Sequence, residues 1–209
     1  MTQNTHRAVR AADSSLRFRV LLIGASTGGP QALRCVLSGI GADFPLPVLI
    51  TQHIDASFAA SFPQWLTETT GLSVQLARAH TAAQAGCVYV APPERHLIVR
   101  RAAAGGFVLA FDDGPPVEFV KPSIDMLFFS AARAFADGCL AVLLTGMGKD
   151  GAAGCRAICR AGGYTVVESA ETCAIFGMPQ AAIACGGACA VLPLHRIAPH
   201  ILDKVYGAR

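Results

Sequence analysis

Ser26, His53 and Asp150 are the three residues whose types and positions together allow acyl-transfer chemistry. A serine hydroxyl is a weak nucleophile at neutral pH and needs an imidazole to take its proton. The imidazole in turn needs a carboxylate, which fixes its tautomer and stabilises the cation that forms. The order Ser–His–Asp differs from that of the α/β-hydrolases, chymotrypsin and subtilisin, but geometry rather than order defines a triad.

Each of these residues directly follows an apolar run that is typical of a buried parallel strand. Ser26 lies in the stretch GASTGG, between a strand predicted over residues 18–23 and a helix predicted over 30–38. His53 and Asp150 follow two later strands. Functional groups of open parallel sheets gather beyond the carboxyl ends of the strands, so we expect the three side chains to meet at one edge.

Glycines near Asp150 allow a ligand to approach the backbone closely. The N–H groups of the stretch Gly146-Met147-Gly148 are therefore candidates for an oxyanion hole. A second glycine-bounded turn, Gly177-Met178-Pro179, offers a similar backbone later in the chain.

Each candidate has a structural explanation when it is taken alone. A serine in a strand-to-helix turn can simply cap the helix, and Asp150 can cap a helix predicted over residues 152–161. A histidine at the end of a strand is more often structural than catalytic. The occurrence of all three residues at strand ends favours catalysis. Weaker candidates are the remaining histidines, His6, His80, His96, His195 and His200.

Strand-like and helix-like runs alternate along the chain, which predicts right-handed βαβ units. Strands are predicted over residues 18–23, 48–52, 73–77, 88–91, 96–99, 107–111, 140–144, 165–167 and 190–192. Helices are predicted over residues 30–38, 56–69, 122–136, 152–161, 179–184 and 195–205. The strands 96–99 and 107–111, joined by a glycine-containing stretch, predict an antiparallel hairpin.

The predicted fold class is therefore α/β, with a doubly wound, mostly parallel sheet, helices on both faces and an inserted antiparallel β-hairpin. A polar N-terminal tail is expected over residues 1–17, followed by one domain over 18–209.

The composition favours a compact α/β enzyme over a nucleic-acid binder. Hydrophobic residues make up 53% and charged residues 15% of the 209 residues, and the net charge is +3 without a basic run. Neither a signal peptide nor an apolar run that could span a bilayer is visible, so we expect a cytoplasmic protein without membrane insertion. Its eight cysteines should then be reduced thiols.

Two cysteine pairs, at 155 and 159 and at 185 and 189, have a spacing that metal ligands can show. Packing of small apolar side chains explains this spacing better, and no metal is expected.

Seven short motifs occur in a defined order along the chain. They are GASTGGP at 24–30, QH at 52–53, APPERHL at 91–97, KPSIDMLF at 121–128, LTGMGKDG at 144–151, GG at 162–163 and FGMP at 176–179. Together they resemble the catalytic domain of the chemotaxis protein-glutamate methylesterases (CheB). The resemblance extends from about residue 18 to about residue 203 and so covers nearly the whole chain.

The resemblance implies a role for each matched residue. It makes Ser26 the nucleophile, His53 the general base and Asp150 the orienting acid. It also implies that Thr27 and Met147 line the site, with the backbone N–H of Met147 as an oxyanion donor.

The implied substrate is a γ-glutamyl methyl ester on the cytoplasmic domain of a methyl-accepting chemoreceptor. Methanol would be released through an acyl-enzyme on Ser26, and receptor glutamines would be deamidated by the same route. No metal or organic cofactor is implied.

Three features depart from the family pattern. Family members commonly begin with a phosphorylatable receiver domain and a linker, whereas about 17 residues precede the first predicted strand here. We therefore expect either constitutive activity or regulation by a partner in trans. Glu168 stands where the family often has glutamine, and the cysteines at 155, 159, 173, 185 and 189 are unusual.

Four other interpretations remain open. An α/β-hydrolase would need more strands before its nucleophile. A nucleotide- or phosphate-binding module would fit a glycine-rich first turn, but the full Gly-x-Gly-x-x-Gly pattern and a P-loop are missing. A non-catalytic scaffold leaves the intact triad unexplained. A methylesterase-like enzyme of a chemosensory pathway that does not control motility would share all the motifs.

Overall fold

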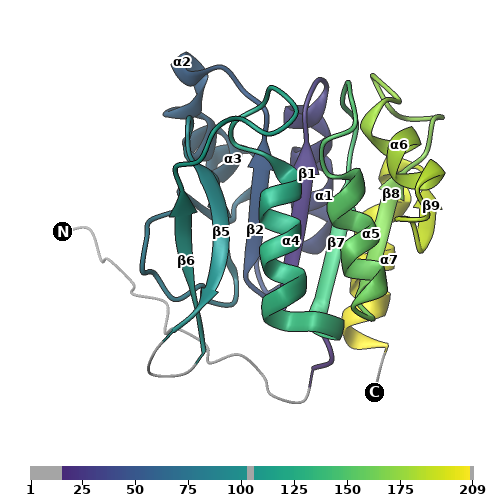
Figure 1. Ribbon diagram of the computed structural model, residues 1–209. Coiled ribbons are helices and arrows are strands. Elements are labelled where there is room, and N and C mark those ends of the chain that lie inside the picture. The colour runs from purple at the N-terminus through teal and green to yellow at the C-terminus, as the bar shows by residue number, and fades with distance from the viewer. Residues whose placement is uncertain (1–15, 103–105, 208–209) are drawn as a thin grey trace.

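The computed structural model describes residues 16–102 and 106–207, and its centre is a seven-stranded parallel sheet (Figure 1). The order of the strands is β3-β4-β2-β1-β7-β8-β9, and β5 and β6 form a separate antiparallel pair. The strands are β1 (Val20–Ala25), β2 (Val48–Gln52), β3 (Ser73–Leu76), β4 (Cys87–Val90), β5 (His96–Arg101), β6 (Phe107–Asp112), β7 (Cys139–Leu143), β8 (Tyr164–Glu168) and β9 (Ala190–Leu192).

Helices cover both faces of the sheet, as predicted (Figure 1). The helices are α1 (Gly29–Ile40), α2 (Ala56–Ala59), α3 (Phe62–Thr70), α4 (Ile124–Phe135), α5 (Ala152–Arg160), α6 (Met178–Ala184) and α7 (Leu194–Tyr206), with a short 3-10 turn η1 (Ala136–Gly138). The predicted α/β fold with an inserted hairpin is confirmed.

The central strand β1 is buried on both faces and shows how the two layers form. Leu21 and Ile23 belong to the apolar cluster that includes α1, α3 and α7. Val20 and Leu22, on the opposite face, belong to the cluster that includes α4, α5 and α6. Successive side chains of a strand point to opposite faces, so a continuous apolar run is what a strand between two helical layers requires.

The order of the strands reverses at β1, because β1 lies between β2 and β7. The helices that follow β1 and β7 lie on opposite faces, α1 with one cluster and α5 with the other. Such a switch point leaves a crevice beyond the carboxyl ends of the two strands. That edge lies at the top of Figure 1, where α2 follows β2.

The main error of the sequence prediction concerns the helix expected over residues 56–69. The structure divides it into α2 and α3, because the chain turns at residues 60 and 61 before α3 starts again with Pro63 in its first turn. Proline favours the first turn of a helix, so it marks the start of α3. Most of the predicted tail, residues 1–15, lies outside the described residues, as does the middle of the hairpin loop, residues 103–105.

No helix in the described parts of the chain is long and apolar enough to cross a membrane.

A glycine sets the distance between α4 and α5. A Cβ atom built on Gly154 would lie 2.5 Å from Cβ of Phe128 and 3.0 Å from Oδ1 of Asp125. Contacts of 2.5 Å are not tolerated, so the two helices can pack at this distance only because residue 154 has no side chain.

We predict that Gly154→Ala destabilises the protein by about 1–3 kcal/mol through overpacking, although helix propensity alone favours alanine by about 1 kcal/mol. Urea unfolding measures the difference. Ala153→Gly, at the exposed neighbouring position of α5, measures the difference in helix propensity between alanine and glycine at a position without the close contact to α4. A Gly154→Ala variant as stable as the unmodified protein would contradict the packing argument.

Candidate active site

Backbone hydrogen bonds between strand ends bring Ser26 and His53 to the same edge of the sheet. The amide of Ser26 donates to the carbonyl of Thr145, which follows β7, at 3.0 Å. The amide of His53 donates to the carbonyl of Ala25, the last residue of β1, also at 3.0 Å. Because β1 lies between β2 and β7, residues that follow all three strands become neighbours.

The turn that carries Ser26 depends on two glycines. Gly28 has a φ of 81°, in the left-handed region that favours glycine, and it caps α1. The amide of Gly29 closes the turn on the carbonyl of Ser26 at 2.7 Å. A Cβ atom on Gly29 would collide with the side chain of Gln52, so a larger residue would displace the turn.

Gln52 connects the backbones of the two candidate residues. Its Nε2 donates to the carbonyl of Ser26 at 2.9 Å and to the carbonyl of His53 at 2.8 Å. The side chain is 2% exposed, so both bonds are shielded from water. In the sequence, Gln52 stands out only as part of a motif, and its place directly before His53 is the signal for a role in the site.

His53 and Asp150 form the central contact of the site. His53 Nε2 lies 2.9 Å from Asp150 Oδ2, and the two side chains are 15% and 4% exposed. An ionised carboxylate can only accept, so the proton of this pair lies on Nε2 and the lone pair on Nδ1. Among the described residues, neither His53 Nδ1 nor Ser26 Oγ has a hydrogen-bond partner. Catalytic hydrogen bonds often tighten only when substrate binds.

The carboxylate of Asp150 lies on the N-terminus of α4. Ser123 Oγ donates to Oδ1 at 2.8 Å, the Ile124 amide to Oδ2 at 2.6 Å and the Asp125 amide to Oδ1 at 3.0 Å. The first amides of a helix have no partner within the helix and attract anions. This contact is not predictable from the sequence, because residues 123–125 lie 25 to 27 positions away from Asp150.

Two opposing effects determine the pKa of Asp150. Burial raises the pKa, but the hydrogen bonds from His53, from the amides of Asp125 and Ile124 and from Ser123 outweigh burial and bring it below its usual value. Asp150 is therefore ionised at neutral pH. This is the state that a residue needs to orient an imidazole and to stabilise its cation.

His96 supports the same helix terminus from behind. It is 1% exposed, and its Nδ1 accepts from the amide of Ser123 at 3.0 Å. Nε2 therefore carries the proton and donates to the carbonyl of Pro115 at 3.0 Å. His96, a weak catalytic candidate by its sequence position, therefore has a structural contact with the backbone of Ser123.

The stretch 146–148 forms the opposite wall, and here one prediction is corrected. The amide of Gly146 donates to the carbonyl of Ile175 at 3.0 Å, so it cannot serve as an oxyanion donor. The amide of Met147 has no acceptor within the described residues, and its side chain is 76% exposed. A Cβ atom on Gly146 would lie 2.6 Å from Cβ of Ser26, so Gly146 lines the site by leaving room for the serine.

Gly148 has a φ of 87°, which favours glycine, and a Cβ atom built on it would meet nothing within 4 Å. Its conformation, rather than crowding, therefore explains a glycine at this position.

Thr145 and Glu168 hold this wall in place. Thr145 Oγ1 donates to the carbonyl of the exposed Thr27 at 2.9 Å and accepts from the amide of Ile175 at 3.0 Å. Glu168, which is fully buried, accepts from the amide of Thr145 at 2.9 Å and from Thr172 Oγ1 at 2.9 Å. Glu168 therefore has a structural role at this position. By sequence it stands out only as a departure from the family pattern.

The remaining histidines lie apart from this constellation. His80 and His195 are exposed, and His200 pairs through Nε2 with the hydroxyl of Tyr164 at 3.1 Å. His6 lies outside the described residues.

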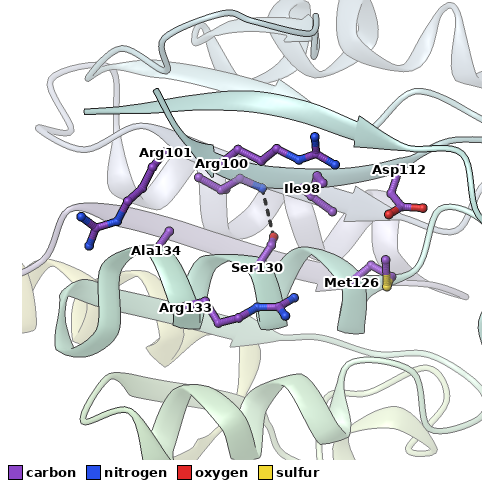
Figure 2. Close-up of a pocket in the computed structure, with 9 residues that line it drawn as sticks. Ile98, Arg100, Arg101, Asp112, Met126, Ser130, Arg133 and Ala134 are labelled. Carbon is purple, nitrogen blue, oxygen red and sulfur yellow. Dashed lines mark hydrogen bonds between the residues drawn. The ribbon is translucent and has the colours of Figure 1, made fainter. Parts of the chain in front are cut away.

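A separate groove of about 370 Å³ lies between β5 and α4 (Figure 2). The groove is lined by Arg100, Arg101 and Arg133. Ser130, which also lines it, accepts a hydrogen bond at Oγ from the amide of Val99. The groove contains none of Ser26, His53 and Asp150.

Asp125 combines burial with two neighbouring acidic groups. Its side chain is 7% exposed, and its Oδ1 accepts from the amide of Gly154 at 2.6 Å. Burial, together with the charges of Asp150 and Glu118, raises its pKa to about 6 even though backbone amides at Gly154 and Gly151 favour the ionised form. Asp125 is thus protonated in the folded protein at pH values at which it is ionised in the unfolded chain.

This difference predicts how stability depends on pH. Between about pH 4 and pH 6 the folded state binds more protons at Asp125 than the unfolded state does. The contribution of this residue to the free energy of unfolding therefore falls as the pH rises, by on the order of 2 kcal/mol over this window. Asp125→Asn should remove that contribution, and its stability should rise more steeply over the window than that of the unmodified protein. Urea unfolding at pH 4, 5, 6 and 7 measures both slopes. Equal slopes would show that the pKa of Asp125 is not raised.

Comparisons with known proteins show which family this chain is similar to. The family model "CheB methylesterase" matches residues 21–201. A protein-glutamate methylesterase/protein-glutamine glutaminase of Anaeromyxobacter dehalogenans is 45% identical over 181 residues, 87% of this chain and 52% of the relative. Another, from Paramagnetospirillum magneticum, is 46% identical over 193 residues, 91% of this chain and 53% of the relative.

A solved structure shows the same fold. The crystal structure of the Thermotoga maritima CheB methylesterase catalytic domain superposes with a TM-score of 0.86 at 33% identity, covering 90% of this chain and 99% of that one. The chain spans about half the length of the curated relatives it matches. Together these matches show that the chain belongs to the CheB methylesterase family.

Proposed function

We propose that this chain is a serine hydrolase that removes methyl esters from glutamyl side chains of methyl-accepting chemoreceptors and releases methanol. One observation carries the proposal: Asp150, held ionised on the N-terminus of α4, contacts His53 Nε2 at 2.9 Å, and Nδ1 of that imidazole has no hydrogen-bond partner among the described residues. Both relatives described above are named for methylesterase activity.

In the proposed reaction Ser26 Oγ attacks the ester carbonyl while His53 Nδ1 takes its proton. The amide of Met147 stabilises the tetrahedral oxyanion, since it is free of protein acceptors among the described residues. His53 then protonates the departing methanol, and water activated by the same imidazole releases the free glutamate. Asp150 stabilises the imidazolium in both steps.

Deamidation of receptor glutamines is proposed as a second activity, by the same acyl-enzyme with ammonia as the leaving group. The names of the relatives include protein-glutamine glutaminase. The partner is the cytoplasmic domain of a chemoreceptor, and a regulatory protein acting in trans is proposed as a second partner. Neither metal nor organic cofactor takes part in these steps.

Methanol release from methyl-labelled chemoreceptor membranes tests the proposal. The unmodified chain should release labelled methanol, and Ser26→Ala should lower the rate by roughly 10⁴-fold or more, because the triad acts as a unit. Urea unfolding of Ser26→Ala, compared with that of the unmodified chain, controls for disturbance of the fold. Release by both the unmodified chain and Ser26→Ala would exclude Ser26 as the nucleophile, and release by neither would contradict the proposed substrate.

Asp150→Asn should separate orientation from binding. An asparagine amide can donate to Nε2 of His53, which would move the imidazole proton to Nδ1 and remove the lone pair that acts as the base in the proposed reaction. We expect kcat to fall by about 10⁴-fold while KM changes little. A kcat close to that of the unmodified chain would remove Asp150 from the mechanism.

A further inference from the structure

Four cysteines gather where α5 meets the segment that leads into β9. Cys155 and Cys159 lie on α5, and Cys185 and Cys189 lie before β9. Every cysteine of the chain is a free thiol in this structure. Cys159 Sγ and Cys189 Sγ lie 3.3 Å apart, although 30 positions separate the two residues in the sequence.

We propose that Cys159 and Cys189 form a reversible dithiol–disulfide site that is oxidised by small disulfides of the glutathione class. The site is independent of the proposed hydrolysis, since it lies at the β8–β9 edge of the sheet and Ser26 follows the central strand β1.

The two thiols differ in the way that a disulfide exchange requires. Cys189 is exposed, so a dissolved reagent can reach it, whereas Cys159 is half-buried. Burial raises the pKa of Cys189, but hydrogen bonds to Thr165 and Cys159 and the charge of Lys204 outweigh it and bring the pKa below its usual value. Burial raises the pKa of Cys159 to about 11. Cys189 is therefore the attacking thiol and Cys159 the resolving one, since the thiolate is the nucleophile.

Thr165 of β8 fixes the relative position of the pair. Its Oγ1 lies 3.0 Å from Cys159 Sγ and 3.4 Å from Cys189 Sγ. The amide of Cys189 also donates to the side chain and to the carbonyl of Thr165, both at 3.0 Å. A bond requires the sulfur atoms to approach from 3.3 Å to about 2.05 Å, which rotation of the exposed Cys189 side chain can supply.

The proposed exchange balances in two steps. Cys189 thiolate attacks one sulfur of oxidised glutathione, the S–S bond of the reagent breaks, and one glutathione thiolate leaves. Cys159 then loses its proton to solvent and attacks the Cys189 sulfur, and the second glutathione leaves as a thiolate. Two protein thiols lose two electrons and two protons, and one small disulfide is reduced to two thiols.

Neighbouring groups do not offer a competing assignment. Cys155 is fully buried, and Cys185 Sγ donates to the carbonyls of Ala152 and Ala182, both at 3.3 Å. Within residues 16–102 and 106–207, no three His, Cys, Asp or Glu side chains are grouped so that they could hold a metal ion. The close contact of two sulfurs therefore favours a disulfide over a metal site.

The test treats the folded, reduced full chain with excess oxidised glutathione, blocks the remaining thiols by alkylation and maps the products by peptide mass spectrometry. We expect one intramolecular link between residues 159 and 189, with the loss of two hydrogens, that dithiothreitol reverses. Cys35→Ser, which removes an exposed cysteine of α1, is the matched control and should leave the link unchanged.

Single variants distinguish the two thiols. Cys159→Ser should trap Cys189 as a stable mixed disulfide with glutathione, and Cys189→Ser should leave Cys159 as a thiol. In the unmodified chain Cys189 should react faster than Cys35. Absence of the 159–189 link, a different intramolecular pairing, or equal rates at Cys189 and Cys35 would overturn the proposal.

Discussion

The site depends on the placement of one buried carboxylate at the start of one helix. Burying a charge without partners costs several kcal/mol, and Asp150 avoids that cost through donors from Ser123, Ile124, Asp125 and His53. Three of these donors belong to the N-cap and first turn of α4, so the helix terminus and the loop after β7 hold each other in place. The imidazole of His53 then contacts a carboxylate that three hydrogen bonds from the start of α4 hold in position.

The order of the strands in the sheet positions the other residues of the site. With β1 between β2 and β7, the backbone bonds Ser26–Thr145 and His53–Ala25 hold the three strand ends at hydrogen-bond distance. Glycines remove the obstacles at the points of closest approach, at Gly146 against Ser26 and at Gly29 against Gln52. A site built on strand ends and helix termini is more rigid than one on free loops, which fits a reaction that needs preorganised donors.

The cysteine pair lies at the other end of the same architecture. Residues of α5 contact β7 and β8, and its first turn follows Asp150, while its last turn carries Cys159. The helix therefore begins next to Asp150 in the chain and carries one member of the thiol pair at its end. Both features arise from long-range packing of short elements with small side chains, which bring backbone and sulfur atoms closer than large side chains would allow.

The sequence by itself determined the element types and the three candidate residues. Continuous apolar runs and amphipathic runs of period 3.6 record burial locally, so β1, α1, α4 and the hairpin were predictable, whereas the turn before Pro63 was missed. Tertiary structure alone decided which partners these residues have. It decided which helix terminus receives Asp150, and that the amide of Gly146 donates to the carbonyl of Ile175 whereas the amide of Met147 has no acceptor within the described residues. Spacing likewise grouped Cys159 with Cys155, whereas the fold places it against Cys189. The reason is physical. The apolar and polar side chains of a segment indicate by themselves which of its faces is buried, but its hydrogen-bond and sulfur partners belong to segments that lie far away in the chain.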